Sequence, residues 1–392
     1  MRAFWSAVLV MAAVGVVLVS LGINVSLGSG ILERISSDSM DVHADFDTFW
    51  RSADAMWHGR DVYDAGARLE NLNPPLWTVV IAPFGLIEPL TAYRTFVMIS
   101  LLTTIGYLAW MADELRLRAG WAVLAMGILF MSSPLLATLA LGQMYPVLAL
   151  GLVAAWIWDR KERQIPSGIA FGLIVALKPS LAPLILWPLA RQRWRAFVAT
   201  MASGAVGTLI GVVVLGPRAT LDWFGILLRS PLSTYWDNAS LPASVARMFT
   251  ENKFAEPLAT LPWLVPVAYV VGIGIIVLTA VKVRHGPEGG LWALTAASLL
   301  ASPVAWNNYL MLLAPGILLL LARGRTPIAL LLLALQFIPP QWPLLWQGKG
   351  TALATLALTL YLYVLVAHWI SFLTLQAEPE YAPGLKSETE KV

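Results

Sequence analysis

Two aspartates separated by a single residue, Asp45 and Asp47, stand at the start of a stretch with helical spacing. Apolar side chains recur there every three or four residues, at Phe46, Phe49, Trp50, Ala53, Met56 and Trp57. This spacing predicts an amphipathic helix lying on the membrane interface. A carboxylate in its first turn either caps the backbone or faces a substrate, from which it can take a proton as a general base. Asp45 is the candidate base, and Asp47 is its competitor.

Basic and amide side chains form the second group of candidates. Lys178 lies in the apolar run 166–190, where a charged side chain is costly and usually faces a cavity or a partner. A lysine that merely ends a helix is the alternative. Arg51 and Arg247 are further candidates, because the planar guanidinium suits phosphate oxygens. Three amides at the predicted ends of apolar runs either bind a ligand or satisfy backbone groups. They are Gln143, Asn238 and Asn308.

The composition indicates what must hold these residues in place. Of 392 residues, 58% are hydrophobic and only 12% are charged, whereas a soluble domain carries about 25% charged residues. Several apolar runs exceed the roughly 20 residues that cross a bilayer as a helix. The sequence therefore predicts an all-α, multi-pass membrane protein with 10 to 12 crossings. Residues 1–375 form a single polytopic domain, and residues 376–392 form a charged cytoplasmic tail.

The same composition excludes several classes of function. The chain has no cysteine, which excludes disulfides, thiolate catalysis and cysteine-ligated metals. Its four histidines are scattered, so a dedicated metal site is not expected. The net charge of +3 comes from dispersed basic residues and does not suggest nucleic-acid binding.

Short loops rich in lysine and arginine predict the orientation of the chain, because such loops stay on the cytoplasmic side. They occur at 160–163, 191–195, 282–284 and 323–325. This places two large loops outside, 29–75 and 217–258, together with the turn at 302–309. The first of these loops holds nine of the 23 acidic residues.

Two apolar runs complicate this orientation. The run 166–190 must enter and return as two half-helices broken at Lys178-Pro179, because basic loops flank it on both sides. The runs between 76 and 134 suggest three crossings where the orientation requires an even number. One of these runs is therefore expected to be re-entrant.

Seven short motifs in a fixed order resemble glycosyltransferase family 87, whose members have the GT-C membrane fold. They are Ala44-Asp45-Phe46-Asp47-Thr48-Phe49-Trp50, Gly59-Arg60-Asp61-Val62-Tyr63-Asp64, Asn73-Pro74-Pro75-Leu76, Gly142-Gln143-Met144-Tyr145, Leu177-Lys178-Pro179, Trp236-Asp237-Asn238-Ala239-Ser240-Leu241 and Ser302-Pro303-Val304-Ala305-Trp306-Asn307-Asn308-Tyr309. The resemblance covers roughly residues 4 to 340.

This resemblance implies a polyprenyl-phosphate sugar as donor and inverting transfer on the extracytoplasmic face of the cell membrane. It implies that Asp45 is the general base. Independently of the resemblance, the break of the run 166–190 at Lys178 makes this lysine the first candidate to pair with the donor phosphate. The sequence departs from the family at Asn308, where many members carry histidine. Asp45-Phe46-Asp47 also matches the Asp-x-Asp string that holds a metal–nucleotide in other glycosyltransferases. Nucleotide sugars stay in the cytoplasm, however, so neither a metal nor another cofactor is expected.

The resemblance leaves the sugar open between mannose and arabinofuranose, and mannose is preferred as the commoner donor in the family. The expected acceptor is a cell-envelope glycolipid or glycan, and membrane lipids are the expected surroundings. A lipid-linked sugar transporter or flippase is the main rival. Transporters place ionisable residues near the bilayer midplane, often on broken helices in repeated halves. Here the acids gather in an outer loop, and only Lys178-Pro179 favours the rival.

Overall fold

The computed structural model describes residues 2–27, 30–284, 286, 288–339 and 342–375. Within these residues the secondary structure is helical, apart from one isolated bridge between Asn238 and Trp306. The protein is therefore an all-α membrane protein, as predicted. The expected cytoplasmic tail, 376–392, lies outside the described residues.

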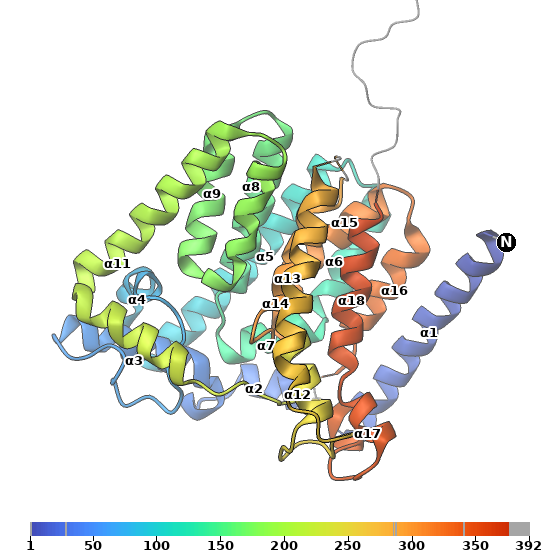
Figure 1. Cartoon of the computed structure of the whole chain (residues 1–392), viewed down its shortest axis with the longest axis horizontal. Helices are drawn as coiled ribbons and strands as arrows, with labels where there is room; N and C mark the ends of the chain where they lie inside the picture. The colour runs from blue at the N-terminus through green and yellow to red at the C-terminus, as the bar shows by residue number, and fades with distance from the viewer. Residues whose placement is uncertain (1, 28–29, 285, 287, 340–341, 376–392) are drawn as a thin grey trace, which may run out of the picture.

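A few long helices and a larger number of shorter ones form the bundle seen in Figure 1. The helices that are long and apolar enough to cross a membrane are α1 (Arg2–Leu27), α5 (Pro89–Glu114), α11 (Trp194–Arg229) and α13 (Leu264–Val283). The other bundle helices are α6 (Ala119–Phe130), α8 (Tyr145–Arg160), α9 (Gln164–Leu177), α10 (Leu186–Ala190), α14 (Gly290–Ala301), α15 (Ala314–Ala322), α16 (Thr326–Gln336) and α18 (Leu360–Leu373).

The number of crossings depends on these shorter helices. Four helices within the described residues meet the criteria of length and hydropathy, or five if α6 and α7 (Ser133–Leu141), bent by 48°, form one span. Most of the remaining apolar helices have only 10–17 residues. The expected total of 10 to 12 crossings includes them and stays a prediction.

Ion pairs gather the basic loops at one end of the bundle, uppermost in Figure 1. Lys161 contacts Glu114 at 2.7 Å, and Arg160 contacts Glu288 at 2.7 Å. Glu288 also pairs with Arg323. These contacts join the ends of α5 and α8 to the segment before α14 and the loop after α15. The basic loops 160–163 and 323–325 therefore lie together.

The run 166–190 reverses at Lys178, as predicted. Helix α9 ends at Leu177, Lys178 has φ −140° and ψ 84°, and the 3₁₀ helix η3 (Pro179–Ile185) leads into α10. Asp159 lies 3.9 Å from Arg191 and 3.2 Å from Arg193. Since Asp159 belongs to the end of α8, the chain leaves this excursion at the end of the bundle where it entered.

A second short excursion accounts for the uneven number of runs between 76 and 134. Helix α4 (Pro75–Ile81) and the 3₁₀ helix η2 (Ala82–Leu86) are too short to cross. The indole of Trp50 donates to the Ile87 carbonyl at 2.9 Å, and that of Trp57 donates to Ala82 at 2.7 Å. The chain thus returns to the end from which it came, and α5 and α6 remain as the pair that runs through the bundle.

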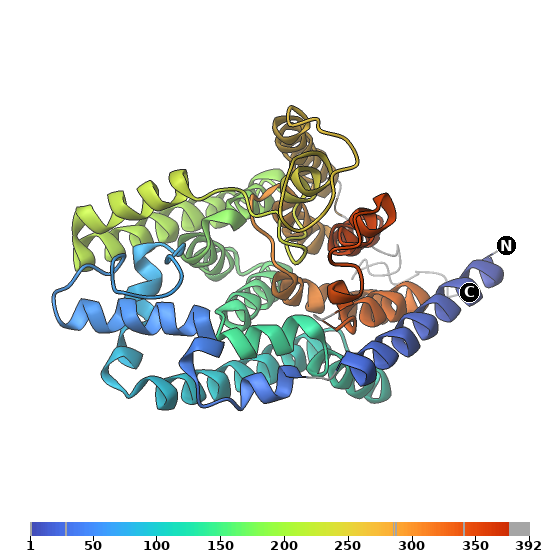
Figure 2. The same ribbon diagram turned by 90° about the horizontal axis from the view of Figure 1, so that it is seen from below.

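The other end of the bundle is covered by short elements. They are α2 (Gly30–Ile35), η1 (Met40–His43), α3 (Ala44–Trp57), α7, α12 (Leu241–Phe249), η5 (Trp342–Leu345) and α17 (Ala352–Ala357), with a 3₁₀ helix, η4 (Asn307–Leu313), leading into α15. Figure 2 views this end directly. The second half of α11 lies beside α3 there, where Ala219 packs with Ala55.

Helix α3 is amphipathic, but its apolar side faces protein. Phe46, Phe49 and Ala53 are buried, and α3 packs against η2, α4 and α5. Gly85 of η2 lies so close that a Cβ there would be 2.7 Å from the Ala53 carbonyl carbon. The re-entrant α4–η2 segment thus covers this face with protein, and the position of α3 at the membrane interface stays a prediction.

Candidate functional site

The start of α3 is fixed by a buried histidine. His43 stacks on Tyr93 with 3.5 Å between ring centroids. Its Nδ1 lies 2.8 Å from the Ala140 carbonyl, and its Nε2 lies 3.1 Å from that of Ser37. The Tyr93 hydroxyl donates to Leu139 at 2.9 Å. These contacts hold the first turn of α3 against the end of α7, where Asp45 meets Gln143.

A glycine allows α3 to pass over the turn between α7 and α8. Gly142 has φ +71°, a conformation that glycine adopts without strain. A Cβ at this position would lie 2.5 Å from the Cβ of Phe46. The close approach of backbone to helix brings the next residue, Gln143, to the Asp45 carboxyl.

The Asp45 carboxyl is largely enclosed, and this sets its proton affinity. Burial raises the pKa of Asp45 from 3.8 to about 6, against the opposing effects of the Gln143 hydrogen bond and the Lys178 charge. A carboxyl with this pKa remains mostly ionised at neutral pH and is a stronger base than an exposed aspartate. Asp45 therefore has the protonation state and the basicity that a general base requires.

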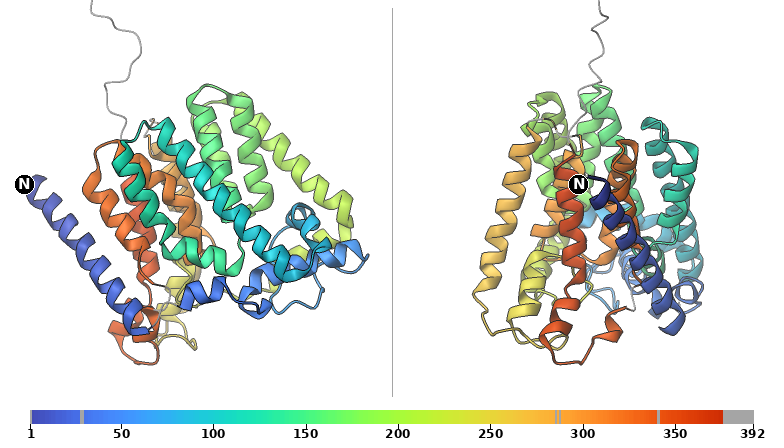
Figure 3. Two further views of the ribbon diagram at one scale, coloured as in Figure 1. Left: turned by 180° about the vertical axis from the view of Figure 1, so that it is seen from behind. Right: turned by 90° about the vertical axis from the view of Figure 1, so that its right-hand side faces the viewer.

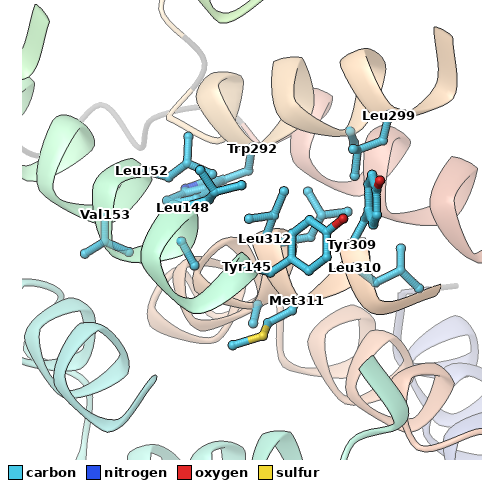
Figure 4. Packing of buried hydrophobic residues seen from close by; sticks show 14 of the residues in the cluster. Tyr145, Leu148, Leu152, Val153, Trp292, Leu299, Tyr309, Leu310, Met311 and Leu312 are labelled. Carbon is cyan, nitrogen blue, oxygen red and sulfur yellow. The ribbon is translucent and has the colours of Figure 1, made fainter. Parts of the chain in front are cut away.

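Lys178 projects toward two aromatic rings at the point where α9 ends. Its Nζ lies 5.0 Å from the ring centroid of Tyr309 and 5.8 Å from that of Tyr145. The two tyrosine rings are 4.4 Å apart, and Figure 4 shows them among the buried hydrophobic residues of the core. Lys178 has no acidic partner within 4 Å among the described residues. Its charge is thus available to an anion close to Asp45.

Asp47 and Arg51 pair with each other instead of joining this group. Arg51 Nε donates to Asp47 at 2.8 Å, one helical turn apart. Asp47 is buried, whereas Arg51 is half-exposed on the surface of α3. The two aspartates of the Asp-x-Asp string therefore do not converge on one point. Within the described part of the chain, no three histidine or acidic side chains are grouped as a metal site would require.

Asn238 and Arg247 serve the backbone rather than a ligand. The Asn238 amide donates to Ser233 and Pro303 and accepts from the backbone of Ser240 and Ala305. The Arg247 guanidinium donates to the carbonyls of four residues: Thr234, Tyr235, Asn238 and Leu358. Both side chains are fully buried. The sequence analysis proposed them as ligand-binding residues, but their hydrogen-bonding groups are already engaged in holding segment 233–241.

Asn308 differs from Asn238 in this respect. It is buried, and neither its Oδ1 nor its Nδ2 has a hydrogen-bonding partner in the protein. The neighbouring Asn307 donates to Ser133 at 2.8 Å, which ties η4 to the start of α7. A buried amide without partners is costly, so Asn308 remains a candidate for binding a ligand.

Asp237 is a second unusual carboxyl that the sequence analysis overlooked. Burial raises its pKa to about 7, although the Arg247 charge opposes this, and its Oδ1 has no partner. The hydroxyl of the buried Tyr361 lies beside the side chains of Ser133 and Trp342. The motif Trp236-Asp237-Asn238 marks this turn in the sequence, but nothing in the motif distinguishes a buried acid from a solvated one. No feature of the sequence points to Tyr361 as a functional residue, because it belongs to an ordinary apolar run.

A family model described as glycosyltransferase family 87 matches residues 71–303, which is more than half of the chain. The chain belongs to glycosyltransferase family 87. The family resemblance is thereby confirmed, and this family 87 protein is a membrane glycosyltransferase. The match begins after Asp45 and ends before Asn308, so it leaves the roles of these two residues untested.

Several characterised relatives of this family 87 protein come from mycobacteria. A polyprenol-phosphate-mannose-dependent alpha-(1-2)-phosphatidylinositol mannoside mannosyltransferase of Mycobacterium tuberculosis is 26% identical over 326 residues, covering 74% of this chain and 73% of the relative. Its counterpart in Mycolicibacterium smegmatis is 23% identical, covering 69% and 68%. An alpha-(1->3)-arabinofuranosyltransferase of M. tuberculosis is 29% identical over 165 residues, covering 40% and 38%.

Proposed function

We propose that this protein transfers mannose from a polyprenyl-phosphate donor to a hydroxyl of a cell-envelope glycolipid or glycan. The observation that carries the proposal is the placement of Asp45, whose burial raises its pKa to about 6, beside Gln143 and the unpaired Lys178. A base and a cation close together suit a reaction that removes a proton from one substrate and leaves a phosphate anion on the other.

In the proposed reaction, Asp45 takes the proton of the acceptor hydroxyl while the hydroxyl oxygen bonds to the anomeric carbon of the donor sugar. The bond from that carbon to the phosphate oxygen breaks, and the polyprenyl phosphate leaves with the electron pair. Lys178 stabilises the negative charge that grows on this phosphate. One displacement on one face of the sugar inverts the anomeric configuration. Gln143 and Asn308 bind sugar hydroxyls or phosphate oxygens.

The mannosyltransferase relatives favour mannose as the sugar more strongly than the arabinofuranosyltransferase relative favours arabinofuranose. The mannosyltransferase of M. tuberculosis aligns with 74% of this chain, whereas the arabinofuranosyltransferase aligns with 40%. Mannose is accordingly the proposed sugar. Polyprenyl-phosphate arabinofuranose is the second candidate, and the local identity of 29% supports it.

We further propose that the reaction takes place on the extracytoplasmic face of the cell membrane. Asp45 lies at the end of the bundle opposite the paired basic loops, and basic loops are retained in the cytoplasm. A substrate carried by a lipid in the outer leaflet would reach α3 at this end.

The test is sugar transfer by the purified protein in nanodiscs. Radiolabelled polyprenyl-phosphate mannose, or separately the arabinofuranose donor, is supplied with an envelope glycolipid extract in excess EDTA. Transfer of mannose that is lost in Asp45→Asn supports the proposal. Asp41→Asn is the matched control, because Asp41 is exposed on the neighbouring η1. Folded protein that transfers neither sugar, or an Asp45→Asn variant as active as the control, would refute it.

A further inference from the structure

A cavity of about 200 Å³ opens at the end of the bundle that carries α3, but it is not lined by α3. Two loop segments enclose it, one following α12 and the other running from η5 into α17. These segments lie side by side below α13 and α18 in Figures 1 and 3. Its lining includes Lys253, Phe254, Glu256, Trp346, Lys349 and Leu358. None of these residues takes part in the proposed transfer.

Two lysines give this cavity its charge. Lys253 lies 5.0 Å from the ring centroid of Phe254, and Lys349 lies 5.0 Å from that of Trp346. Neither lysine has an acidic partner within 4 Å among the described residues. One acid, Glu256, lies in the lining, so the cavity carries a net positive charge. An aromatic ring beneath each ammonium group favours a fixed position for the charge.

Three buried or partly buried hydrogen bonds hold the walls of the cavity in place. Arg247 donates to the carbonyl of Leu358 at 2.9 Å, and the Asn252 amide donates to the Arg247 carbonyl at 3.1 Å. The Thr355 hydroxyl donates to the Glu256 carbonyl across the two segments. The cavity is thus formed by the fold itself and does not depend on the lysine side chains.

An apolar surface lies next to the cavity. Helix α17 buries Ala354 and Thr355 and turns Leu353, with 63% of its surface exposed, and Leu356 outward. Leu344 of η5 is exposed by 53%, and Leu345 beside it is also exposed. Exposed leucines beside cationic side chains are typical of a segment that lies at the boundary of acyl chains and headgroups.

We propose that this cavity binds the phosphate of an anionic lipid headgroup in the outer leaflet. Lys253 and Lys349 donate to the phosphate oxygens, while the leucines of η5 and α17 contact the acyl chains. The proposal rests on the orientation proposed above, but not on the sugar, the acceptor or the role of Asp45.

The test measures lipid binding in the absence of any sugar donor. The full chain is incorporated in nanodiscs of phosphatidylcholine with a minor fraction of phosphatidylinositol, and retained lipids are counted by native mass spectrometry. Lys253→Gln combined with Lys349→Gln should reduce phosphatidylinositol retention about 30-fold, since each charge contributes about a factor of five near an anionic surface. The corresponding double change to arginine should retain it. Lys282→Gln, at an exposed position on the opposite end, is the matched control.

A separate arm distinguishes the source of the phosphate. Inorganic phosphate is added to protein in nanodiscs of phosphatidylcholine alone, and binding is measured by calorimetry. Retention of phosphatidylinositol that depends on the two lysines, without binding of inorganic phosphate, supports a lipid headgroup. Equal retention by the wild type and the double glutamine variant would overturn the proposal, as would binding of inorganic phosphate without enrichment of phosphatidylinositol. Because no sugar donor is present, none of these binding results depends on whether the protein has transferase activity.

Discussion

Replacing Asp45 with asparagine should remove activity and at the same time stabilise the protein. The variant keeps the shape of the side chain and its contact with Gln143 but cannot accept the acceptor proton. General bases contribute about 10²–10⁴-fold to rate, so kcat should fall by this factor while donor binding is retained. Burial raises the pKa from 3.8 to about 6, which means that ionising Asp45 in the folded protein costs about 3 kcal/mol.

The sign of this stability effect follows from the direction of the pKa change. A carboxyl whose pKa is higher in the folded state favours folding at low pH and loses that contribution as the pH rises through about 6. The Asp45→Asn side chain cannot ionise, so the variant does not lose this stability as the pH rises. Its thermal unfolding temperature should therefore exceed that of the wild type near pH 8, and the difference should vanish near pH 4.

Two measurements check this reasoning: initial rates of sugar transfer at saturating donor, and thermal unfolding in detergent across the pH range. Asp41→Asn should change neither. An Asp45→Asn variant with wild-type rates would refute the assignment of the base. A gain in stability that does not depend on pH would show that the enclosed carboxyl has an ordinary pKa.

Three further predictions concern the same end of the molecule. With wild-type protein, kcat/KM for the acceptor should fall about tenfold per pH unit below about pH 6 and level off above it, because the base must be ionised; an acidic limb near pH 4 would contradict this. Lys178→Gln should weaken donor binding about 10- to 150-fold, since a charged hydrogen bond contributes about 1.5–3 kcal/mol. Lys178→Arg should retain most of the donor affinity. An effect confined to the KM of the acceptor would count against phosphate binding. Arg247→Gln should lower the free energy of unfolding by about 3 kcal/mol or more without raising the donor KM of the folded fraction, because buried carbonyls lose their donor. Thermal unfolding compared with Arg284→Gln, at an exposed position, checks this.

The sequence analysis succeeded where one physical requirement dominates. The basic loops on both sides of run 166–190 leave no topology except a return, and the proline after Lys178 marks the reversal. The helix at Asp45 follows from its apolar spacing in the same way. These inferences need only local sequence and the constraint that the membrane places on charge.

Inferences that depend on neighbours distant in the sequence failed. The spacing of α3 shows that one side is apolar, but only the return of α4 and η2 decides that protein covers it. Arg247 and Asn238 have the chemistry of ligand-binding residues, yet backbone carbonyls accept the hydrogen bonds of both side chains. Asp237 and Asn238 are adjacent polar residues, and only the fold leaves Oδ1 of the first without a hydrogen-bonding partner while it engages the amide of the second.

The length of helix α9 determines how far Lys178 lies from the end of the bundle that carries the basic loops. Its 14 residues span about 21 Å, measured from the end where Asp159 meets Arg191 and Arg193. The helix packs closely against α11, because a Cβ on Gly172 would lie 2.3 Å from the Thr200 carbonyl. The length of α9 therefore sets how far Lys178 lies from that end of the bundle, and one residue added to α9 would move Lys178 by about 1.5 Å and turn it by about 100°.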